Sequence, residues 1–249
     1  MGFEVADAYD RFMGRYSREL SHQMADLAGI AVGQRVLDVG SGPGALTTEL
    51  VARVGSGSVV AVDPSAGFVE AVRERLPGVD VHKAAVEELP FEDGVFDATL
   101  AQLVVHFMKD PVRGLHEMAR VTRSGGLVAA CVWDLAGGRS PLGVFWRAAR
   151  DVDPDVVDES HLPGAHGGHL AELMEQAGLH QVLSTELQVP FIPDSFDDWW
   201  EPFTLGVGPA GDYVKGLDDE TRAAVRERCR QLLPTAPRAV AWAACGVVA

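Results

Sequence analysis

The chain is short of basic residues, cysteines and long apolar runs. Its 249 residues carry 21 Lys and Arg against 36 Asp and Glu, a net charge of −15, so no dense basic face is available for nucleic acid phosphates. Three cysteines, an odd number without paired spacing, argue against a disulfide framework and fit reduced thiols. No apolar run reaches the roughly 20 residues that span a bilayer, and no signal segment opens the chain. We therefore expect a cytoplasmic protein that has no membrane span and does not bind nucleic acid.

Metal ligands are not grouped either. His161, His166 and His169 are close in sequence, but their Gly- and Pro-rich stretch offers no Cys and no patterned acid. A zinc site needs three or four convergent ligands. The sequence therefore predicts no metal centre.

The most informative feature that the chain does have is a glycine-rich turn between an apolar strand and a helix. Residues 36–39 form the strand, and Gly40, Gly42 and Gly44 follow it directly. Glycines remove side chains where the backbone turns sharply and a ligand comes close. Asp63 ends the next apolar run, where an acid can accept hydrogen bonds from ribose hydroxyls. The chain is therefore predicted to bind an adenosine-containing cofactor.

Two cofactor classes compete for this turn, because Gly40-x-Gly42-x-x-Ala45 also satisfies the looser dinucleotide fingerprint. An acid inside the first strand, Asp38, followed by Gly-x-Gly-x-Gly resembles the class I S-adenosylmethionine-dependent methyltransferases. Later blocks extend the resemblance to the small-molecule branch that includes ubiquinone and menaquinone biosynthesis methyltransferases. These blocks are Glu88–Asp97, Leu103–Phe107, Glu117–Val121 and Ser124–Leu127. The resemblance covers roughly residues 9–133, and a nicotinamide reductase would have no reason to carry the later blocks.

Strands and helices alternate from residue 35 to about 133, the pattern of a parallel sheet with helices on both faces. Strands are expected at 35–40, 58–63, 79–83, 96–101, 126–133, 182–191 and 239–248. Helices are expected at 17–30, 45–54, 66–76, 111–122, 170–178 and 218–233. Pro111 suits a first helical turn, and Ser124-Gly125-Gly126 is expected to end that helix.

The resemblance implies an α/β, Rossmann-like, seven-stranded and mostly parallel sheet whose last strand runs antiparallel. It also implies an inserted lid over the carboxyl edge. We expect one domain, 1–249, in three parts. These are a cofactor-covering helical segment at 1–34, a cofactor-binding core at 35–133, and lid insertions with closing strands at 134–249.

The resemblance also assigns cofactor contacts. The glycine loop would cradle the amino acid portion of S-adenosylmethionine, Asp38 would face its ammonium group, and Asp63 would bind the ribose. Members of the family often carry an Asp that accepts from the adenine amino group where this chain has Ala85. The expected cofactor-binding residues are Tyr16, Asp38, Gly40, Ser41, Gly42, Gly44, Asp63, Pro64, Ala85, Val86, Glu87 and Gln102.

The segment 9–17 resembles the N-terminal segment that folds over the cofactor in this branch. Arg15 and Tyr16 are candidate partners of the methionine carboxylate, because arginine offers planar charge-assisted donors. The alternative is a surface helix that begins with Ser17 as its N-cap. The sequence leaves both interpretations open.

The expected binding site for the methyl acceptor consists of one histidine and several apolar, mainly aromatic, residues. His106 follows the fourth strand, where it is either a general base beside the transferred methyl group or a residue that packs and orients the loop. The expected lining of the substrate pocket is Met13, Trp133, Trp146, Trp199 and Phe203. Aromatic side chains at the carboxyl edge favour a small apolar or aromatic acceptor.

We therefore predict a methyltransferase that converts S-adenosylmethionine to S-adenosylhomocysteine. The acceptor's O, N or C atom would attack the sulfonium methyl group in line. The alternatives are a non-catalytic S-adenosylmethionine-binding protein and a nicotinamide-dependent reductase. The acceptor and the oligomeric state do not follow from the sequence, because lid sequences diverge with substrate.

Overall fold

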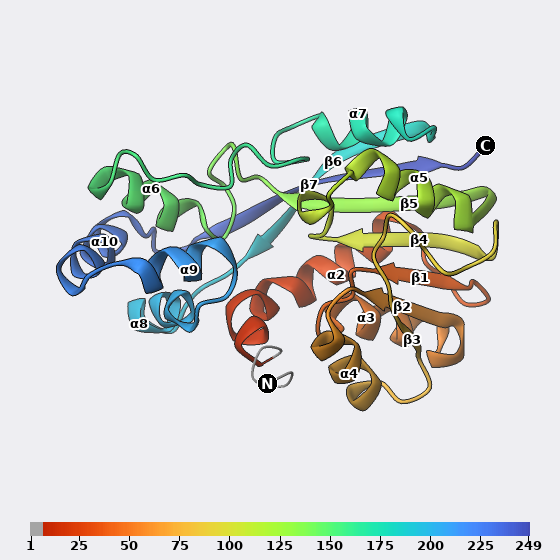
Figure 1. The fold of residues 1–249 in the computed structure, drawn as a ribbon, viewed down its shortest axis with the longest axis horizontal. Coiled ribbons are helices and arrows are strands. Elements are labelled where there is room, and N and C mark those ends of the chain that lie inside the picture. Colours follow the sequence, from red (N-terminus) through yellow and green to blue (C-terminus); the bar gives the residue numbers. More distant parts are fainter. Residues whose placement is uncertain (1–6) are drawn as a thin grey trace.

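The computed structural model describes residues 7–249, which form one twisted sheet with helices against it (Figure 1). The sheet has seven strands in the order β3-β2-β1-β4-β5-β7-β6. Their bounds are β1 Val36–Val39, β2 Val59–Asp63, β3 Asp80–Lys83, β4 Phe96–Gln102, β5 Thr122–Trp133, β6 His180–Pro190 and β7 Arg238–Val247. The strands β1 to β5 pair in parallel, and β7 runs antiparallel between β5 and β6. The expected fold class is confirmed.

Strand order reverses between β1 and β4, and this reversal fixes where a ligand can bind. The chain moves outward from β1 through β2 to β3, then returns to β4 on the other side of β1. Right-handed crossovers in opposite directions place their helices on opposite faces of the sheet. The helices of the two faces diverge at the reversal, so a crevice opens at the carboxyl ends of β1 and β4.

Helices within the core begin and end close to the expected positions. They are α2 Arg15–Leu27, α3 Ala45–Val54, α4 Ala66–Arg75, α5 Pro111–Val121 and α7 His169–Gln176. Ser65 and Asp110 cap α4 and α5 by accepting hydrogen bonds from backbone N–H groups in the first turn. Pro111 stands in the first turn of α5, as predicted.

Two expectations about helix ends are wrong. Ser124-Gly125-Gly126 does not end α5, because β5 begins at Thr122 directly after the helix and includes all three residues. Ser17 is not an N-cap either. The helix already runs through a π-helical stretch, Asp10–Gly14, and the Ser17 hydroxyl donates to the carbonyl of Met13 within it. The early start places residues 9–17 over the carboxyl edge of the sheet.

The two insertions build a group of helices beyond the carboxyl ends of the parallel strands (Figure 1). They are α6 Gly143–Val152, α8 Phe196–Trp200 and α9 Gly208–Gly216, joined by α10 Asp219–Leu232. We call this group the cap. Its centre is aromatic: the rings of Phe145 and Phe203 stack with centroids 4.6 Å apart, and Trp199 lies 4.9 Å from Phe203. No helix within residues 7–249 is long and apolar enough to cross a membrane.

Candidate active site

The glycine-rich loop leaves β1 and turns back toward β2. The N–H groups of Gly40 and Ser41 both donate to the carbonyl of Val62, at 2.8 and 3.0 Å. Gly40 has φ +69°, and a Cβ at this position would lie 2.4 Å from a methyl group of Val104. A side chain is therefore excluded by backbone conformation and by contact. Gly44, also with positive φ, precedes α3 without a side-chain cap, so the helix presents free N–H donors to this loop.

Asp63 ends β2 and holds the loop in place. One carboxylate oxygen accepts from the N–H of Gly42 at 2.9 Å, and the other accepts from the N–H of Ser65 at 2.8 Å. The side chain is buried, and burial raises the pKa of this carboxyl although both hydrogen bonds act in the opposite direction. Each oxygen keeps a further lone pair that can accept from a ligand hydroxyl.

Asp38 lies beneath the loop in the middle of the sheet edge. It is 1% exposed, and its carboxylate accepts from the Thr47 hydroxyl at 2.6 Å. Burial raises its pKa to about 7, and the nearby charge of Asp63 adds to this effect. A buried carboxylate with one hydrogen-bond donor is stabilised by a cation. An ammonium group is the cation that the predicted cofactor would supply.

A small cavity lies between the glycine loop, the end of β4 and the N-terminal helix. Gln102 contributes an orphaned acceptor: its amide nitrogen donates to the carbonyl of Ser17 at 3.1 Å, while its buried Oε1 has no partner within residues 7–249. The residues that line the cavity are Tyr9, Ser17, Asp38, Gly40, Ser41, Gly42, Pro43, Ala45, Leu46, Gln102 and Leu103. Asp38 and Gln102 accept hydrogen bonds and the start of α3 donates them, so the cavity fits an amino acid zwitterion.

The start of the described chain is fastened over this cavity. Arg75, from α4, pairs with Asp7 and Asp10 and donates to the carbonyl of Pro43 in the glycine loop. Tyr9 lies between these contacts and packs edge to face on Phe68. Burial and the charges of Asp63 and Asp10 raise the pKa of Tyr9 to about 12, so its hydroxyl stays protonated near neutral pH.

Arg15 and Tyr16 lie away from this cavity. The Arg15 guanidinium makes a bidentate pair with Asp198, at 3.2 Å for each nitrogen, and covers the ring of Phe191. The Tyr16 ring packs between Phe191 and Trp133. In this structure Arg15 joins the N-terminal helix to α8 of the cap, and Tyr16 packs at the ends of β5 and β6, so neither side chain reaches the glycine loop.

The residues predicted to bind adenine lie on the loop after β3. Ala85 is exposed and Val86 is buried. Glu87 does not extend into solvent: its carboxylate accepts from the N–H of Lys109 at 2.9 Å, and its carbonyl accepts from Arg113. Glu87 thus fixes the turn that leads into α5, and Pro64 is exposed beside Asp63.

A second cavity adjoins the first and is almost entirely apolar. It is lined by Tyr9, Phe12, Met13, Leu103, His106, Phe107, Trp133, Leu135, Leu142, Glu159 and the segment Val207–Ala210. Of the predicted substrate residues, Met13 and Trp133 line it directly. Trp146 does not, and Trp199 and Phe203 face a separate small cavity beside Tyr16. Aromatic composition alone did not distinguish lining residues from the packed centre of the cap.

His106 lines this apolar cavity. Burial lowers its pKa to about 4, so the ring is neutral near pH 7. Its Nδ1 and the indole Nε1 of Trp133 are buried without a hydrogen-bond partner among the described residues. Two unpartnered polar atoms in an apolar cavity are candidate contacts for a polar atom of a ligand.

Leu103 and Tyr9 line both cavities and therefore mark the boundary between them. Leu103 has φ +60°, a left-handed backbone conformation that costs a branched side chain roughly 1–2 kcal/mol. The sequence did not single out either residue, although Tyr9 begins the segment 9–17 and Leu103 begins the block Leu103–Phe107. Glu159 was also missed, and no periodic pattern points to it.

The described residues contain no group of three His, Cys, Asp or Glu side chains that could hold a metal ion. Cys131, Cys229 and Cys245 are buried free thiols. Burial raises the pKa of Cys131 to about 12, so this thiol is not a nucleophile near pH 7.

Comparison with known proteins places residues 37–130 in a methyltransferase domain family. An uncharacterized methyltransferase of Mycobacterium tuberculosis is 33% identical over 211 residues, which cover 83% of this chain and 76% of that protein. A demethylmenaquinone methyltransferase of Mycobacterium sp. (strain KMS) is 37% identical over 208 residues, covering 72% of this chain and 86% of that protein.

Solved structures with the same fold are more distant in sequence. The YcgJ protein of Bacillus subtilis superposes with a TM-score of 0.60 at 20% identity and covers 92% of this chain and 97% of that one. The (4+2)-cyclase SpnF gives a TM-score of 0.60 at 21% identity over 92% of this chain and 80% of that one. A cyclase among these neighbours means that the fold alone does not assign the reaction.

Proposed function

The chain belongs to the class I S-adenosylmethionine-dependent methyltransferases, and we propose that it methylates a small apolar or aromatic molecule. The observation that carries this proposal is the pair of adjoining cavities. One is polar and lies at the glycine-rich loop, the other is apolar and lies under the cap, and both are lined by Tyr9 and Leu103. A methyl donor in the first cavity would then face an acceptor in the second.

The polar cavity is the proposed site of the cofactor's amino acid portion. Asp38 and the orphaned Oε1 of Gln102 would accept from the ammonium group. The free N–H groups at the start of α3 would donate to the carboxylate. Asp63 would accept from the ribose hydroxyls while it keeps the N–H of Gly42. The loop at Ala85 and Val86 would contact adenine through its backbone.

The apolar cavity is the proposed acceptor site. The bound cofactor would supply an electrophilic methyl group, which needs little chemical assistance beyond alignment and a dry environment. The chain would provide both through the apolar wall and the N-terminal segment. The neutral His106 ring, with Nδ1 unpartnered, would accept a hydrogen bond from the reacting group and its proton, while the Trp133 N–H would donate to the same group. We also propose a cytoplasmic location, because the three thiols are free.

The first test is calorimetric titration with S-adenosylhomocysteine. We expect micromolar binding by the wild type and a loss of at least about tenfold in Asp63→Ala, because two backbone donors and the ribose lose a charged acceptor. Asp80→Ala is the matched control, since Asp80 is an exposed acid on the neighbouring strand β3. This control should bind like the wild type.

The two alternatives are separated by cofactor titration and by a methyl-transfer assay. Tight binding of NAD(P) without binding of S-adenosylhomocysteine would replace this proposal by a reductase. Binding of S-adenosylhomocysteine without methylation of any acceptor from a metabolite extract would leave a non-catalytic binding protein. Sustained transfer of labelled methyl groups from S-adenosylmethionine to an extract component would support the methyltransferase.

A further inference from the structure

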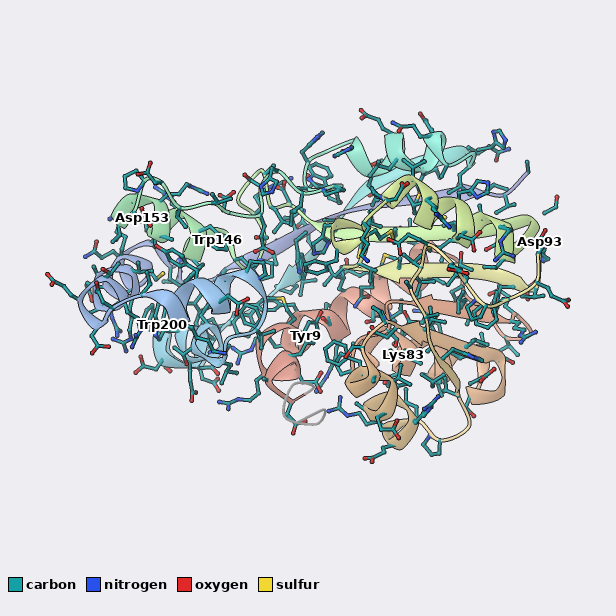
Figure 2. The ribbon with its side chains drawn as sticks, viewed as in Figure 1. Tyr9, Lys83, Asp93, Trp146, Asp153 and Trp200 are labelled. Atoms are coloured by element: carbon teal, nitrogen blue, oxygen red, sulfur yellow. The ribbon has the colours of Figure 1, made fainter. Side chains whose placement is uncertain are left out.

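Among the described residues that line the proposed acceptor cavity, Glu159 is the one acid. It belongs to the first insertion, in the loop between α6 and α7, and is 5% exposed. Its Oε2 accepts from the indole N–H of Trp146 at 3.0 Å. Among residues 7–249 it has no salt-bridge partner, although the nearby His161 acts to lower the pKa of its carboxyl. Figure 2 shows Trp146 among the cap helices and Tyr9 nearer the sheet, so Glu159 belongs to the cap side of the cavity.

The bond to Trp146 does not explain why this residue is an acid. One carbonyl oxygen satisfies an indole N–H, and a glutamine would supply it without burying a charge. Burial raises the pKa of Glu159, so the side chain is held in an environment that disfavours its ionised form. The remaining oxygen, Oε1, makes no hydrogen bond within the described chain. Leu142 and the segment Val207–Ala210 line the same cavity and offer apolar surface.

The polar groups of the cavity therefore fall into two sets. His106 follows β4 and Trp133 ends β5. Both lie at the sheet edge, on the same side as Tyr9 and Leu103, which adjoin the cofactor cavity. Glu159 comes from the cap. A ligand that spans the cavity would meet one set at its reacting end and the carboxylate at its other end.

We propose that Glu159 determines acceptor specificity, and that the acceptor is an apolar, ring-containing molecule with a hydrogen-bond donor, a hydroxyl or an amine, at the end that faces the cap. This inference rests on the proposed function, because it assumes that the apolar cavity holds the methyl acceptor. It adds a chemical requirement that a purely apolar site would not impose. Removing Oε1 as an acceptor should abolish the preference for donor-bearing ligands without changing cofactor binding.

The test uses three probes of equal ring size on the full chain saturated with S-adenosylhomocysteine. They are 2-naphthalenemethanol, 2-(aminomethyl)naphthalene and 2-methylnaphthalene. All three share the ring and its substituent carbon, which carries a hydroxyl, an amine that is protonated near neutral pH, or no donor. Calorimetry is run on the wild type, Glu159→Gln, Glu159→Leu and the control Glu172→Gln, an exposed acid on α7. Glu159→Gln keeps an acceptor for Trp146, so it separates the charge from the packing of the cap. S-adenosylhomocysteine affinity and thermal unfolding verify that each variant is folded.

We expect the wild type and Glu172→Gln to bind one or both donor-bearing probes at least about tenfold more tightly than 2-methylnaphthalene. Preference for the amine in the wild type that disappears in Glu159→Gln identifies an amine-bearing acceptor. Preference for the alcohol that survives partly in Glu159→Gln and is lost in Glu159→Leu identifies a hydroxyl. Equal binding of all three probes by the wild type, a preference unchanged in Glu159→Leu, or no binding of any probe would each overturn the proposal. Failure of the proposed function is seen separately, as a wild type that does not bind S-adenosylhomocysteine.

Discussion

Replacing Asp38 by asparagine is expected to stabilise the ligand-free protein above pH 7 while it weakens cofactor binding. The folded state raises the pKa of this buried carboxyl from 3.8 to about 7. Because the folded chain then binds the proton more tightly than the unfolded chain, the stabilisation is complete below about pH 4 and is lost as the pH rises to 7. This pKa shift lowers the free energy of unfolding at pH 8 by about 4 kcal/mol relative to its value below pH 4.

Asparagine keeps an acceptor for the Thr47 hydroxyl but buries an amide N–H₂ without a known partner, at a cost of about 1–3 kcal/mol. The variant should therefore gain about 1–3 kcal/mol at pH 8. The difference between variant and wild type should change by about 3 kcal/mol between pH 5 and pH 8. Urea unfolding of both ligand-free proteins at the two pH values measures this change.

The same substitution removes the carboxylate that would face the cofactor's ammonium group. A charge-assisted hydrogen bond contributes about 1.5–3 kcal/mol, so the dissociation constant for S-adenosylhomocysteine should rise about 10- to 100-fold at pH 8. For the wild type, the ionised fraction of Asp38 falls about tenfold from pH 8 to pH 6, and affinity should fall by the same factor. Calorimetry at both pH values compares the two proteins, and the variant should lack this part of the pH dependence.

The wild type alone cannot reveal the Asp38 effect, because His106 acts in the opposite direction. Burial lowers the pKa of His106 from 6.5 to about 4, so stability rises with pH across that interval by about 3 kcal/mol. The two contributions largely cancel in the wild type, and Asp38→Asn should expose the slope due to His106. The reasoning is refuted if the stability difference is the same at pH 5 and pH 8, or if the variant binds S-adenosylhomocysteine as tightly as the wild type.

Three further predictions concern the loop and the shared wall. Gly40→Ala should destabilise the protein by about 2–3 kcal/mol, because its Cβ would lie 2.4 Å from a methyl group of Val104. Gly42→Ala has open space around its Cβ and φ +52°, so it should cost only about 1 kcal/mol. Equal losses of stability in urea unfolding would contradict this. Leu103→Gly relieves backbone strain but joins the two cavities. We expect kcat to fall at least about tenfold while S-adenosylhomocysteine affinity changes little. An unchanged kcat would argue against Leu103 as a wall between the cavities. Arg75→Ala removes the contacts of Arg75 with Asp7, Asp10 and the carbonyl of Pro43. S-adenosylhomocysteine should then dissociate several-fold faster in stopped-flow experiments. An unchanged dissociation rate would mean that the N-terminal segment does not cover the cofactor.

The cofactor half of the molecule could be predicted from sequence because its signals are local. A glycine run after an apolar strand fixes a turn, and the turn fixes where the next helix begins: the predicted helix 45–54 is α3 itself. The placement of Asp38, inside β1, and of Asp63, at the end of β2, follows from the strands, since parallel strands bring their carboxyl ends to one edge. The register then aligns Asp38 with Ala61 of β2, two residues before Asp63.

The acceptor half depends on contacts between segments that are far apart in the chain, and sequence patterns carry no record of them. Trp146 and Trp133 are alike in composition, yet Trp133 ends a strand and faces the cavity, while Trp146 turns its indole to Glu159. Arg15 looked like a carboxylate ligand because the sequence could not show that Asp198, 183 residues away, lies beside it.

The same non-local placement explains why the residues most informative about the acceptor were not found first. The role proposed for Glu159 depends on the first insertion, which brings this residue to the same apolar cavity as residues at the ends of β4 and β5. The role proposed for Leu103 depends on its strained backbone and on its position in the lining of both cavities. Because a fold does not by itself assign a reaction, under the proposed function these residues of the cap and of the shared wall would select the acceptor, while the glycine loop would hold the cofactor.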